Sequence, residues 1–410
     1  MKIVLTTVGT TGDIQPYLAL ARGLLARGHD VRAASHPMHR ARFEATGAEF
    51  RGAGPPLSTE ALARVLEDLG KLRDPYQQFA IFAERVFLND VERQFEEHCA
   101  LSKDADVVVA HRFDWIGQEA AIKNGVPWAS VTILPEIIRT HEAPRFRIGN
   151  LGRWWTKFIW DSAETKVKPL NQKVQAVLQK LGCPARPLSI VGAMSPRLNL
   201  VAASPSFVTV HEDWPATVKV TGVWFHDEPS YEPPGPLSSF LRAHDRPVVI
   251  TFGSMSAFRT DRTRALVLEA IERVGCSAVV QIGGADDQEE TGAAGVFFAG
   301  YVPHEFLFAR ASAVVHHAGA GTTMAAVRAG VASITVPHFF DQYYWAGMAH
   351  SRGVATKPLL RSTLKARPLA QRIREALAKV SMQEKARVLS EKVRAERGVD
   401  RAIELIESIG

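Results

Sequence analysis

The hydrophobic positions along the chain predict buried strands that alternate with amphipathic helices. Residues 2–8 form a short apolar run, a turn of Gly and Thr follows, and residues 14–27 repeat apolar positions at helical spacing before a strand at 29–34. Strands that are apolar throughout are typical of parallel sheets, because helices cover both faces of such sheets. The start of the chain therefore predicts a β-loop-α-β unit.

The same order of elements recurs along the chain. Strands are expected at residues 106–110 and 128–133, with a helix near 118–123 between them. After a Pro-rich stretch the pattern starts again, with a strand at 248–252 and a helix at about 261–274. Further strands are expected at residues 278–282, 295–299 and 313–316. We therefore predict an α/β protein with two Rossmann-like, doubly wound domains.

The length of the chain, 410 residues, exceeds what one hydrophobic core usually supports. The predicted parts are an N-terminal domain at 1–225, a linker at 226–247, a C-terminal domain at 248–380, and helices at 381–410 that pack back on the N-terminal domain. Doubly wound domains that face a central cleft would present the carboxyl ends of both sheets to it. Such a cleft suits two substrates.

Composition narrows the class of protein. Hydrophobic residues make up 46% of the chain and charged residues 22%, as in ordinary globular domains, and the net charge of +6 favours anionic ligands. This charge is spread along the chain, so it does not indicate nucleic acid. Cys99, Cys183 and Cys276 lie far apart, which fits a reducing cytosol. No signal peptide or membrane-spanning run is recognisable, and we expect a cytoplasmic protein.

The most specific signal is a strand, a turn of small residues and a helix in the second predicted domain. Gly319 and Gly321 allow backbone amides to approach a ligand at the positive end of the helix. Thr322 and Thr323 add hydroxyl donors, so the loop suits a diphosphate. His317 ends the strand, where a ring nitrogen is placed to donate to a phosphate oxygen. The alternative is a core histidine, which the neighbouring loop disfavours.

This loop resembles the donor loop of family 1 glycosyltransferases. The resemblance rests on His317-Ala318-Gly319-Ala320-Gly321-Thr322-Thr323 and on two further segments with the same order and spacing. Upstream, residues 300–304 resemble the segment that packs against the nucleotide base, which includes Tyr301 and Val302. Downstream, residues 336–342 resemble the proline and Asp-Gln motif of the family. The resemblance implies a GT-B fold and sugar transfer from a nucleotide diphosphate.

The Asp-Gln motif has two interpretations. By the resemblance, Asp341 and Gln342 bind hydroxyls of the donor sugar, since a carboxylate and an amide together accept and donate hydrogen bonds. Asp341 also precedes a helix expected at 342–351, where it suits an N-cap. The two roles are compatible.

Gly12-Asp13-Ile14-Gln15-Pro16 stands where the family has its G-H-x-x-P element, with Asp13 in place of the usual catalytic histidine. Aspartate there is typical of a subgroup that resembles sterol, rhamnolipid and glycopeptide-antibiotic glycosyltransferases, in which it is proposed to take the acceptor proton. A carboxyl group with a pKa of about 4 is a weak base, so this role calls for a raised pKa. The equally weighted alternative is an N-cap on a helix starting at Ile14.

Three further candidates follow predicted strands and so lie at the ligand-binding edge of a sheet. Ser254 follows the strand at 248–252, in a turn that resembles the family's phosphate loop. His111 and Asp114 follow the strand at 106–110 and are candidates for acceptor contacts beside Asp13, with a solvated loop as the alternative.

The donor nucleotide stays open between UDP and dTDP. Plant members carry a glutamate that binds the ribose three residues beyond the Ser/Thr of the loop, where this chain has Ala325. The implied mechanism is a single in-line displacement with inversion at the anomeric carbon. Backbone amides and His317 would take the place of a metal ion, so we expect neither a metal nor another cofactor.

Residues 134–160 are unusually apolar and are expected to recognise a lipophilic acceptor. Basic residues alternate with the apolar ones. The segment suits a wide pocket for such an acceptor, contact with a membrane surface, or an amphipathic helix that covers the N-terminal core. The candidate acceptor contacts are Leu134, Ile138, Trp154 and Trp155.

Other enzyme classes lack their signatures. A nicotinamide oxidoreductase would carry G-x-G-x-x-G after the first strand, and a serine hydrolase a G-x-S-x-G elbow, and the sequence has neither. Asp104-Ala105-Asp106 precedes a strand, the wrong edge of a sheet for a metal site. A nucleotide-sugar epimerase of the same fold and a non-catalytic sugar-nucleotide-binding partner protein stay open.

Overall fold

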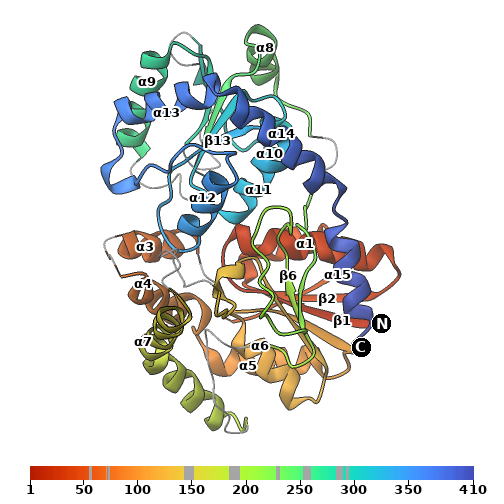
Figure 1. Cartoon of the computed structure of the whole chain (residues 1–410). Helices are drawn as coiled ribbons and strands as arrows, with labels where there is room; N and C mark the ends of the chain where they lie inside the picture. The colour runs from red at the N-terminus through yellow and green to blue at the C-terminus, as the bar shows by residue number, and fades with distance from the viewer. Residues whose placement is uncertain are drawn as a thin grey trace. The chain divides into compact units, whose positions relative to one another are not determined.

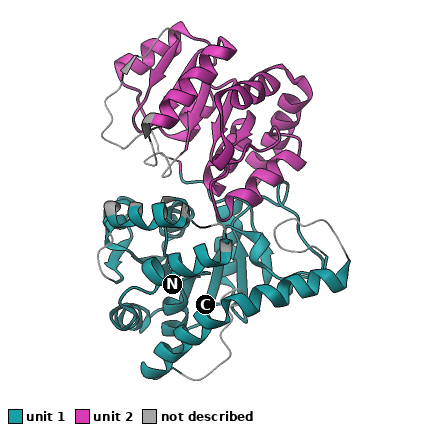
Figure 2. Ribbon diagram, turned by 90° about the vertical axis from the view of Figure 1, so that its left-hand side faces the viewer, with its two compact units in different colours: residues 1–226, 397–410 teal, residues 227–396 magenta. Residues whose placement is uncertain are grey.

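The computed structural model describes residues 1–54, 58–70, 72, 74–142, 152–183, 194–227, 231–252, 260–282, 290–291 and 295–410. They form two compact units, residues 1–226 with 397–410 and residues 227–396 (Figure 2). Each unit is a largely parallel sheet with helices on its faces, as two Rossmann-like domains require.

The sheet of unit 1 has the order β3-β2-β1-β4-β5-β6-β7 in the described part of the chain, with every pair parallel. Its strands are β1 (Lys2–Thr6), β2 (Asp30–Ser35), β3 (Glu49–Gly52), β4 (Val107–His111), β5 (Trp128–Thr132), β6 (Leu198–Val201) and β7 (Val218–Val220). Its helices are α1 (Thr11–Ala26), η1 (Pro37–His39), α2 (Arg40–Glu44), α3 (Thr59–Gly70), α4 (Pro75–Phe82), η2 (Ala83–Phe87), α5 (Val91–Ser102), α6 (Trp115–Lys123), η3 (Pro135–Ile137), α7 (Arg153–Lys180) and α15 (Gly398–Glu407).

The alternation of side chains along β1 explains why its sequence is apolar throughout. Ile3 and Leu5 point to one face, where they pack in a core shared with α1 and α15. Val4 points to the other face and packs in the core beneath α5 and α6. The two layers of helices lie on opposite sides of the sheet (Figure 1). Both faces are therefore dry, as expected for a parallel sheet.

The sheet of unit 2 has the order β10-β11-β9-β8-β12-β13 among the described residues, and β10 pairs antiparallel to β11 while the other pairs are parallel. Its strands are β8 (Val248–Thr251), β9 (Ala278–Gln281), β10 (Glu290–Thr291), β11 (Val296–Phe298), β12 (Ala313–His316) and β13 (Ala332–Thr335). Its helices are α8 (Gly235–Ala243), α9 (Thr260–Val274), α10 (His304–Phe308), α11 (Ala320–Ala329), α12 (Gln342–Ser351), η6 (Arg361–Thr363), α13 (Ala366–Ala378) and α14 (Val380–Ala395).

The Pro-rich stretch interpreted as a linker contains a helix that belongs to unit 2. Leu237 and Phe240 of α8 are buried in the same core as Val249 and Phe297 of the sheet. Pro236 lies in the first turn of α8, where a backbone N–H would have no hydrogen-bond partner within the helix, so its absence costs nothing. Composition alone therefore does not separate a linker from a helix that starts with proline.

The helices expected at residues 381–410 divide between the units. α14 packs against α11 in unit 2, whereas α15 packs against α1 in unit 1, close to the N-terminus (Figure 1). Two glycines permit close packing at α15. At the start of this helix, a Cβ atom on Gly398 would clash with the carbonyl oxygen of Val223, which follows β7. A Cβ atom on Gly23 of α1 would lie 2.8 Å from Cδ1 of Ile403.

None of the helices in the described ranges is long and apolar enough to cross a lipid bilayer.

We predict that Ile403→Ala destabilises unit 1 by about 2–5 kcal/mol, because Ile403 is fully buried between α1 and the sheet and its removal leaves a cavity. The measurement is urea denaturation followed by circular dichroism. The control is Val380→Ala, which shortens a side chain that is 74% exposed and is expected to change stability by less than about 0.5 kcal/mol. Equal effects of the two variants would contradict a structural role for α15.

Candidate active site

The ends of two neighbouring strands form the candidate site of unit 1. Thr6 of β1 pairs with Ala110 of β4, but the chain leaves β1 toward β2 and leaves β4 toward β5. Ligands of doubly wound sheets bind outside the carboxyl ends of the strands where the strand order reverses in this way. Asp13 lies in the first turn of α1, and His111 is the last residue of β4. The topology thus brings two predicted residues together.

Asp13 is held at the start of α1, but it is not the N-cap residue. Thr10 occupies that position, so the helix begins three residues earlier than the pattern at Ile14 predicts. The Oδ2 atom of Asp13 accepts the backbone N–H of Thr10 at 2.8 Å, as the third helical residue of a capping box does. A Cβ atom on Gly9 would clash with the same Oδ2 atom, which explains glycine at that position.

The second carboxylate oxygen of Asp13 faces a histidine. Its Oδ1 atom lies 3.8 Å from Nε2 of His111, whose side chain is only 4% exposed. The Nδ1 atom of His111 accepts the backbone N–H of Phe113 at 3.3 Å, so the proton of the neutral ring lies on Nε2, toward Asp13. Burial raises the pKa of Asp13 against the opposing effect of His111, and burial lowers the pKa of His111.

Asp114 takes a position behind this pair rather than on the surface. Its Oδ1 atom accepts the N–H of Gly117 at 3.0 Å and so caps α6, and its Oδ2 atom lies 3.4 Å from Nε2 of His98. Burial acts against both charges, but the partner's charge and the hydrogen bonds together outweigh it, so the pKa of His98 is raised and that of Asp114 is lowered. The side chain of Asp114 is 1% exposed, which favours a supporting role over the predicted acceptor contact.

Sequence reasoning missed two polar side chains at this site. The hydroxyl of Tyr17 is buried without a hydrogen-bond partner among the described residues, and burial, then the charges of Asp114 and Asp13, raise its pKa well above 10. Nε2 of His39 lies 3.3 Å from the carbonyl oxygen of Gly9, and burial lowers the pKa of this histidine to about 4. One signal was available, because Tyr17 lies one helical turn beyond Asp13.

Unit 2 repeats this topology. His316 of β12 pairs with Thr251 of β8, and the chain leaves these two strands in opposite directions. The residues after β8, including the predicted Ser254, lie outside the described part of the chain. After β12 the backbone turns at Ala318, with φ of +64°, and Gly319 is the N-cap of α11.

The start of α11 has the features of an anion site. The helix begins at Ala320, four residues earlier than the expected Met324, so the backbone N–H groups of Ala320, Gly321 and Thr322 belong to its first turn, where such groups have no partner within a helix. Gly321 is exposed and has no atom near the place of a Cβ atom. The Oγ1 atom of Thr323 is buried and unpaired among the described residues.

His317 lies directly over this turn. A Cβ atom on Gly319 would lie 2.5 Å from Nε2 of His317, so only glycine leaves room for the ring. Nδ1 of His317 is buried without a partner in the described ranges. Burial, reinforced by neighbouring histidines, holds the pKa of His317 well below 6.5. The ring is therefore neutral and offers one N–H donor rather than a positive charge.

Gln342 begins α12 as expected but uses one of its polar atoms internally. Its Oε1 atom accepts the N–H of His338 at 2.8 Å and that of Phe339 at 3.4 Å, which leaves the amide N–H groups as donors toward a ligand. Asp341 has the N-cap position, yet its side chain makes no capping hydrogen bond. Its carboxylate therefore does not serve the helix start that the sequence suggests.

The two residues predicted beside the nucleotide base differ in exposure. Tyr301 is 59% exposed, whereas Val302 is buried in the core of unit 2. The amide of Gln281 donates to the carbonyl oxygens of Gly300 and Val302, at 2.9 and 3.3 Å. The backbone of this segment is thus held at the end of β9. The buried side chain of Val302 leaves only its backbone for contacts with a base.

The predicted acceptor residues do not share one environment. Ile138 is 2% exposed and belongs to the interior, and Leu134 is half-buried, while Trp154 and Trp155 are 68% and 47% exposed. Of the aromatic side chains of this segment, Trp160 is buried at 2% as a core-covering helix requires. Residues 143–151 lie outside the described ranges.

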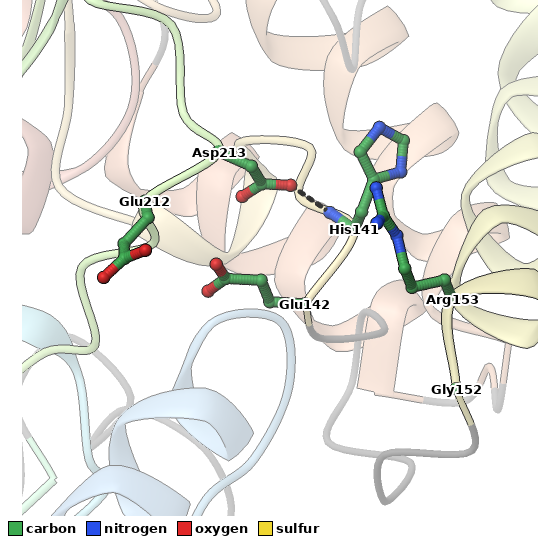
Figure 3. A pocket seen from close by; sticks show the side chains of 6 residues that line it. All are labelled: His141, Glu142, Gly152, Arg153, Glu212 and Asp213. Carbon is green, nitrogen blue, oxygen red and sulfur yellow. Dashed lines mark hydrogen bonds between the residues drawn. The ribbon is translucent and has the colours of Figure 1, made fainter.

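A pocket of about 550 Å³ lies next to these residues in unit 1 (Figure 3). The carboxylate of Asp213 points to the backbone N–H of His141 and also accepts the hydroxyl of Thr140 at 2.6 Å. The residues that line the pocket are mixed in charge, with Glu142, Glu212 and Asp213 together with Arg153 and His141. This chemistry does not match an apolar acceptor, and we assign the pocket no role.

The residues that the structure describes contain no group of three or more His, Cys, Asp or Glu side chains arranged to hold a metal ion.

Both units match domains of known protein families. Residues 3–142 match the glycosyltransferase family 28 N-terminal domain, and residues 265–403 match the erythromycin biosynthesis protein CIII-like C-terminal domain. The chain is 31% identical to the O-mycaminosyltylonolide 6-deoxyallosyltransferase of Streptomyces fradiae, over 99% of this chain and 97% of that protein. The chain belongs to the GT-B glycosyltransferases of family 1. The resemblance read from the loop at His317 is confirmed.

Other relatives agree with this assignment. This glycosyltransferase is 29% identical to a sterol 3-beta-glucosyltransferase of Komagataella phaffii, over 98% of this chain but only 34% of that longer protein. The solved glycosyltransferase VinC, in complex with dTDP, shares the fold with a TM-score of 0.73 at 19% identity, over 100% of this chain and 99% of that one. These relatives show that the protein is a glycosyltransferase enzyme.

We predict that this glycosyltransferase loses stability on mild acidification. Burial lowers the pKa of His304 to about 4, of His316 to about 3 and of His338 to about 4, and that of His317 further. In the unfolded chain these groups bind protons near pH 6.5, so between pH 6.5 and 4 the unfolded state holds more protons and stability falls as pH falls. The expected loss between about pH 7 and 5.5 is about 1.2 kcal/mol for each ring and about 5 kcal/mol for the four, measured by urea denaturation.

The matched variant is His304→Phe, because the His304 ring stacks on Phe308 and a phenyl ring keeps this contact. It removes one of several buried rings that titrate in this direction, His39 and His111 of unit 1 among them, so the slope of stability against pH is expected to fall by less than about a quarter. An unchanged slope would assign the acid sensitivity to other groups.

Proposed function

We propose that this glycosyltransferase moves a hexose from a UDP- or dTDP-sugar to a hydroxyl group of a lipophilic small molecule, such as a sterol, lipid, polyketide or phenol. The reaction is a single displacement with inversion, and it needs no metal ion. The observation that carries the proposal is the environment of Asp13, a carboxylate with a raised pKa, beside neutral His111, at the reversal of strand order in unit 1.

The turn after β12 supports a diphosphate donor. Its glycine N-cap, the free amides of the first turn of α11 and the neutral N–H of His317 are hydrogen-bond donors that suit negative charge. Tyr301 is exposed and suits contact with the base, and Asp341 and the amide of Gln342, at the start of α12, suit hydrogen bonds with sugar hydroxyls. The nucleotide stays between UDP and dTDP, and the dTDP complex of VinC makes dTDP the first to test.

The acceptor class is supported by the relatives. One of them is named for transfer to O-mycaminosyltylonolide and another for transfer to a sterol, and both cover nearly the whole of this chain. These acceptors are hydroxylated and predominantly apolar. The apolar composition of residues 134–160 agrees with such an acceptor, although the structure describes only part of that segment.

In the proposed reaction, Asp13 takes the proton of the acceptor hydroxyl as its oxygen bonds to the anomeric carbon. The bond from that carbon to the diphosphate breaks, and its electron pair leaves with the phosphate oxygen. The amides of α11 and His317 stabilise this charge. Oδ2 of Asp13 is held by Thr10, so Oδ1 is the atom that receives the proton. The raised pKa brings the base closer to neutral pH and makes the proton transfer more favourable.

We predict that Asp13→Asn lowers kcat by about 10²–10⁴-fold with little change in nucleotide affinity. An amide oxygen still accepts the N–H of Thr10, so the helix start is kept while the base is lost. The measurements are turnover with a competent acceptor and calorimetry with UDP or dTDP. Asp245→Asn makes the same change at an exposed site and is expected to be neutral. Full activity of Asp13→Asn would exclude Asp13 as the base.

The experiment that tests the whole proposal is a screen of UDP- and dTDP-sugars against sterols, macrolides and phenols. We expect nucleotide release together with an acceptor product heavier by one hexose, and an anomeric configuration opposite to that of the donor. Activity is expected to persist in excess chelator, because amides and His317 rather than a metal stabilise the leaving group. A loss of more than about tenfold in chelator contradicts the metal-independent mechanism.

A further inference from the structure

Three aromatic side chains at the start of α7 lie on its solvent side. Trp154, Trp155 and Phe158 are 68%, 47% and 54% exposed. Their rings form one cluster. The ring centroids of Trp154 and Trp155 are 4.8 Å apart, and that of Phe158 lies 6.2 Å from Trp154 and 5.9 Å from Trp155. We call these three residues the aromatic patch. Contiguous exposed apolar surface of this kind marks an interaction site more often than scattered single residues do.

The orientation of α7 fixes the patch outward. Thr156 and Trp160, between and beyond the patch residues, are 1% and 2% exposed, and Ala163 and Val167 continue the same buried stripe. The helix packs with this stripe against α4, and it lies at the edge of unit 1 (Figure 1). A rotation that buried the patch would expose Trp160, so the two sets of aromatic residues cannot exchange places.

The same helix carries much of the positive charge of the protein. Over residues 153–180 there are six cations and two anions, a net charge of +4, against +6 for the whole chain. Its ionisable residues are Arg153, Lys157, Asp161, Glu164, Lys166, Lys168, Lys173 and Lys180. Next to the patch, Asp161 pairs with both Lys157 and Arg139 at 2.6 and 2.7 Å, so this group of three keeps a net positive charge. Arg153 directly precedes Trp154.

We propose that the aromatic patch docks the protein on the surface of an anionic lipid bilayer. Indole and phenyl rings bind at the boundary between headgroups and acyl chains, while the long side chains of Arg153 and Lys157 reach the phosphates. Each basic residue near an anionic surface adds to the attraction. This inference concerns the surface of α7 and does not depend on the identity of the acceptor.

The charge of the helix decides between a bilayer and a second copy of the chain. A symmetric dimer through the patch would bring Arg153 and the positively charged group of Arg139, Lys157 and Asp161 close to their copies, and like charges in contact disfavour association. An anionic bilayer instead complements both features of the helix, the exposed aromatic rings and the cations beside them. Binding to it is peripheral.

The test uses the full chain and vesicles of phosphatidylcholine with or without phosphatidylglycerol. We expect co-sedimentation with the anionic vesicles that weakens in high salt, and quenching of tryptophan emission by brominated acyl chains. The triple variant Trp154→Ser, Trp155→Ser, Phe158→Ser is expected to bind at least about tenfold more weakly. Arg153→Gln with Lys157→Gln is expected to reduce the preference for phosphatidylglycerol.

The matched control removes apolar side chains from another helix, by Val380→Ser with Val388→Ser on α14, which are 74% and 41% exposed. It is expected to bind like the wild type, and thermal unfolding followed by circular dichroism checks that all variants are folded. Unchanged vesicle binding by the folded triple variant overturns the proposal. The proposal is also overturned if the triple variant binds vesicles like the wild type but has a smaller sedimentation coefficient. That result would assign the patch to self-association.

Discussion

The parallel pairing of β1 with β4, and of β8 with β12, is the constraint on which the two candidate half-sites depend. In each pair the chain departs in opposite directions, so no helix crosses over the shared carboxyl ends. Asp13 and His111 meet at the first of these points, and His317 with the N-terminus of α11 lies at the second. The same strand topology thus positions both the proposed base and the proposed anion site.

Burial of ionisable groups has a cost, and the protein offsets it in two ways. In unit 1, His98 and Asp114 are buried as a charged pair, because each stabilises the charge of the other. In unit 2, burial keeps His304, His316, His317 and His338 neutral. The neutral rings add no positive charge at the start of α11, so the helix amides are the main partners that the structure offers to an anion.

The sequence was most informative where local physics decides the structure. The apolar runs located β8, β9 and β12 to within a residue, and the Gly/Thr turn predicted a helix start close to that of α11. It was less informative where a helix begins in a polar turn: Thr10 rather than Asp13 caps α1, and α8 lies inside a Pro-rich stretch. Several residue types suit the N-cap position. Which of them begins the helix depends on where the preceding strand ends and the chain turns.

The sequence by itself determined the alternation of strands and helices, the family, and the residue types that carry the proposed chemistry, because these follow from periodicity and from motifs of neighbouring residues. Only the tertiary structure decided that His111 faces Asp13, that Asp114 is buried against His98, that Tyr17 joins this site, and that Trp154 and Trp155 are exposed while Trp160 is not. Exposure and pKa depend on contacts between residues far apart in the chain, which no local pattern encodes.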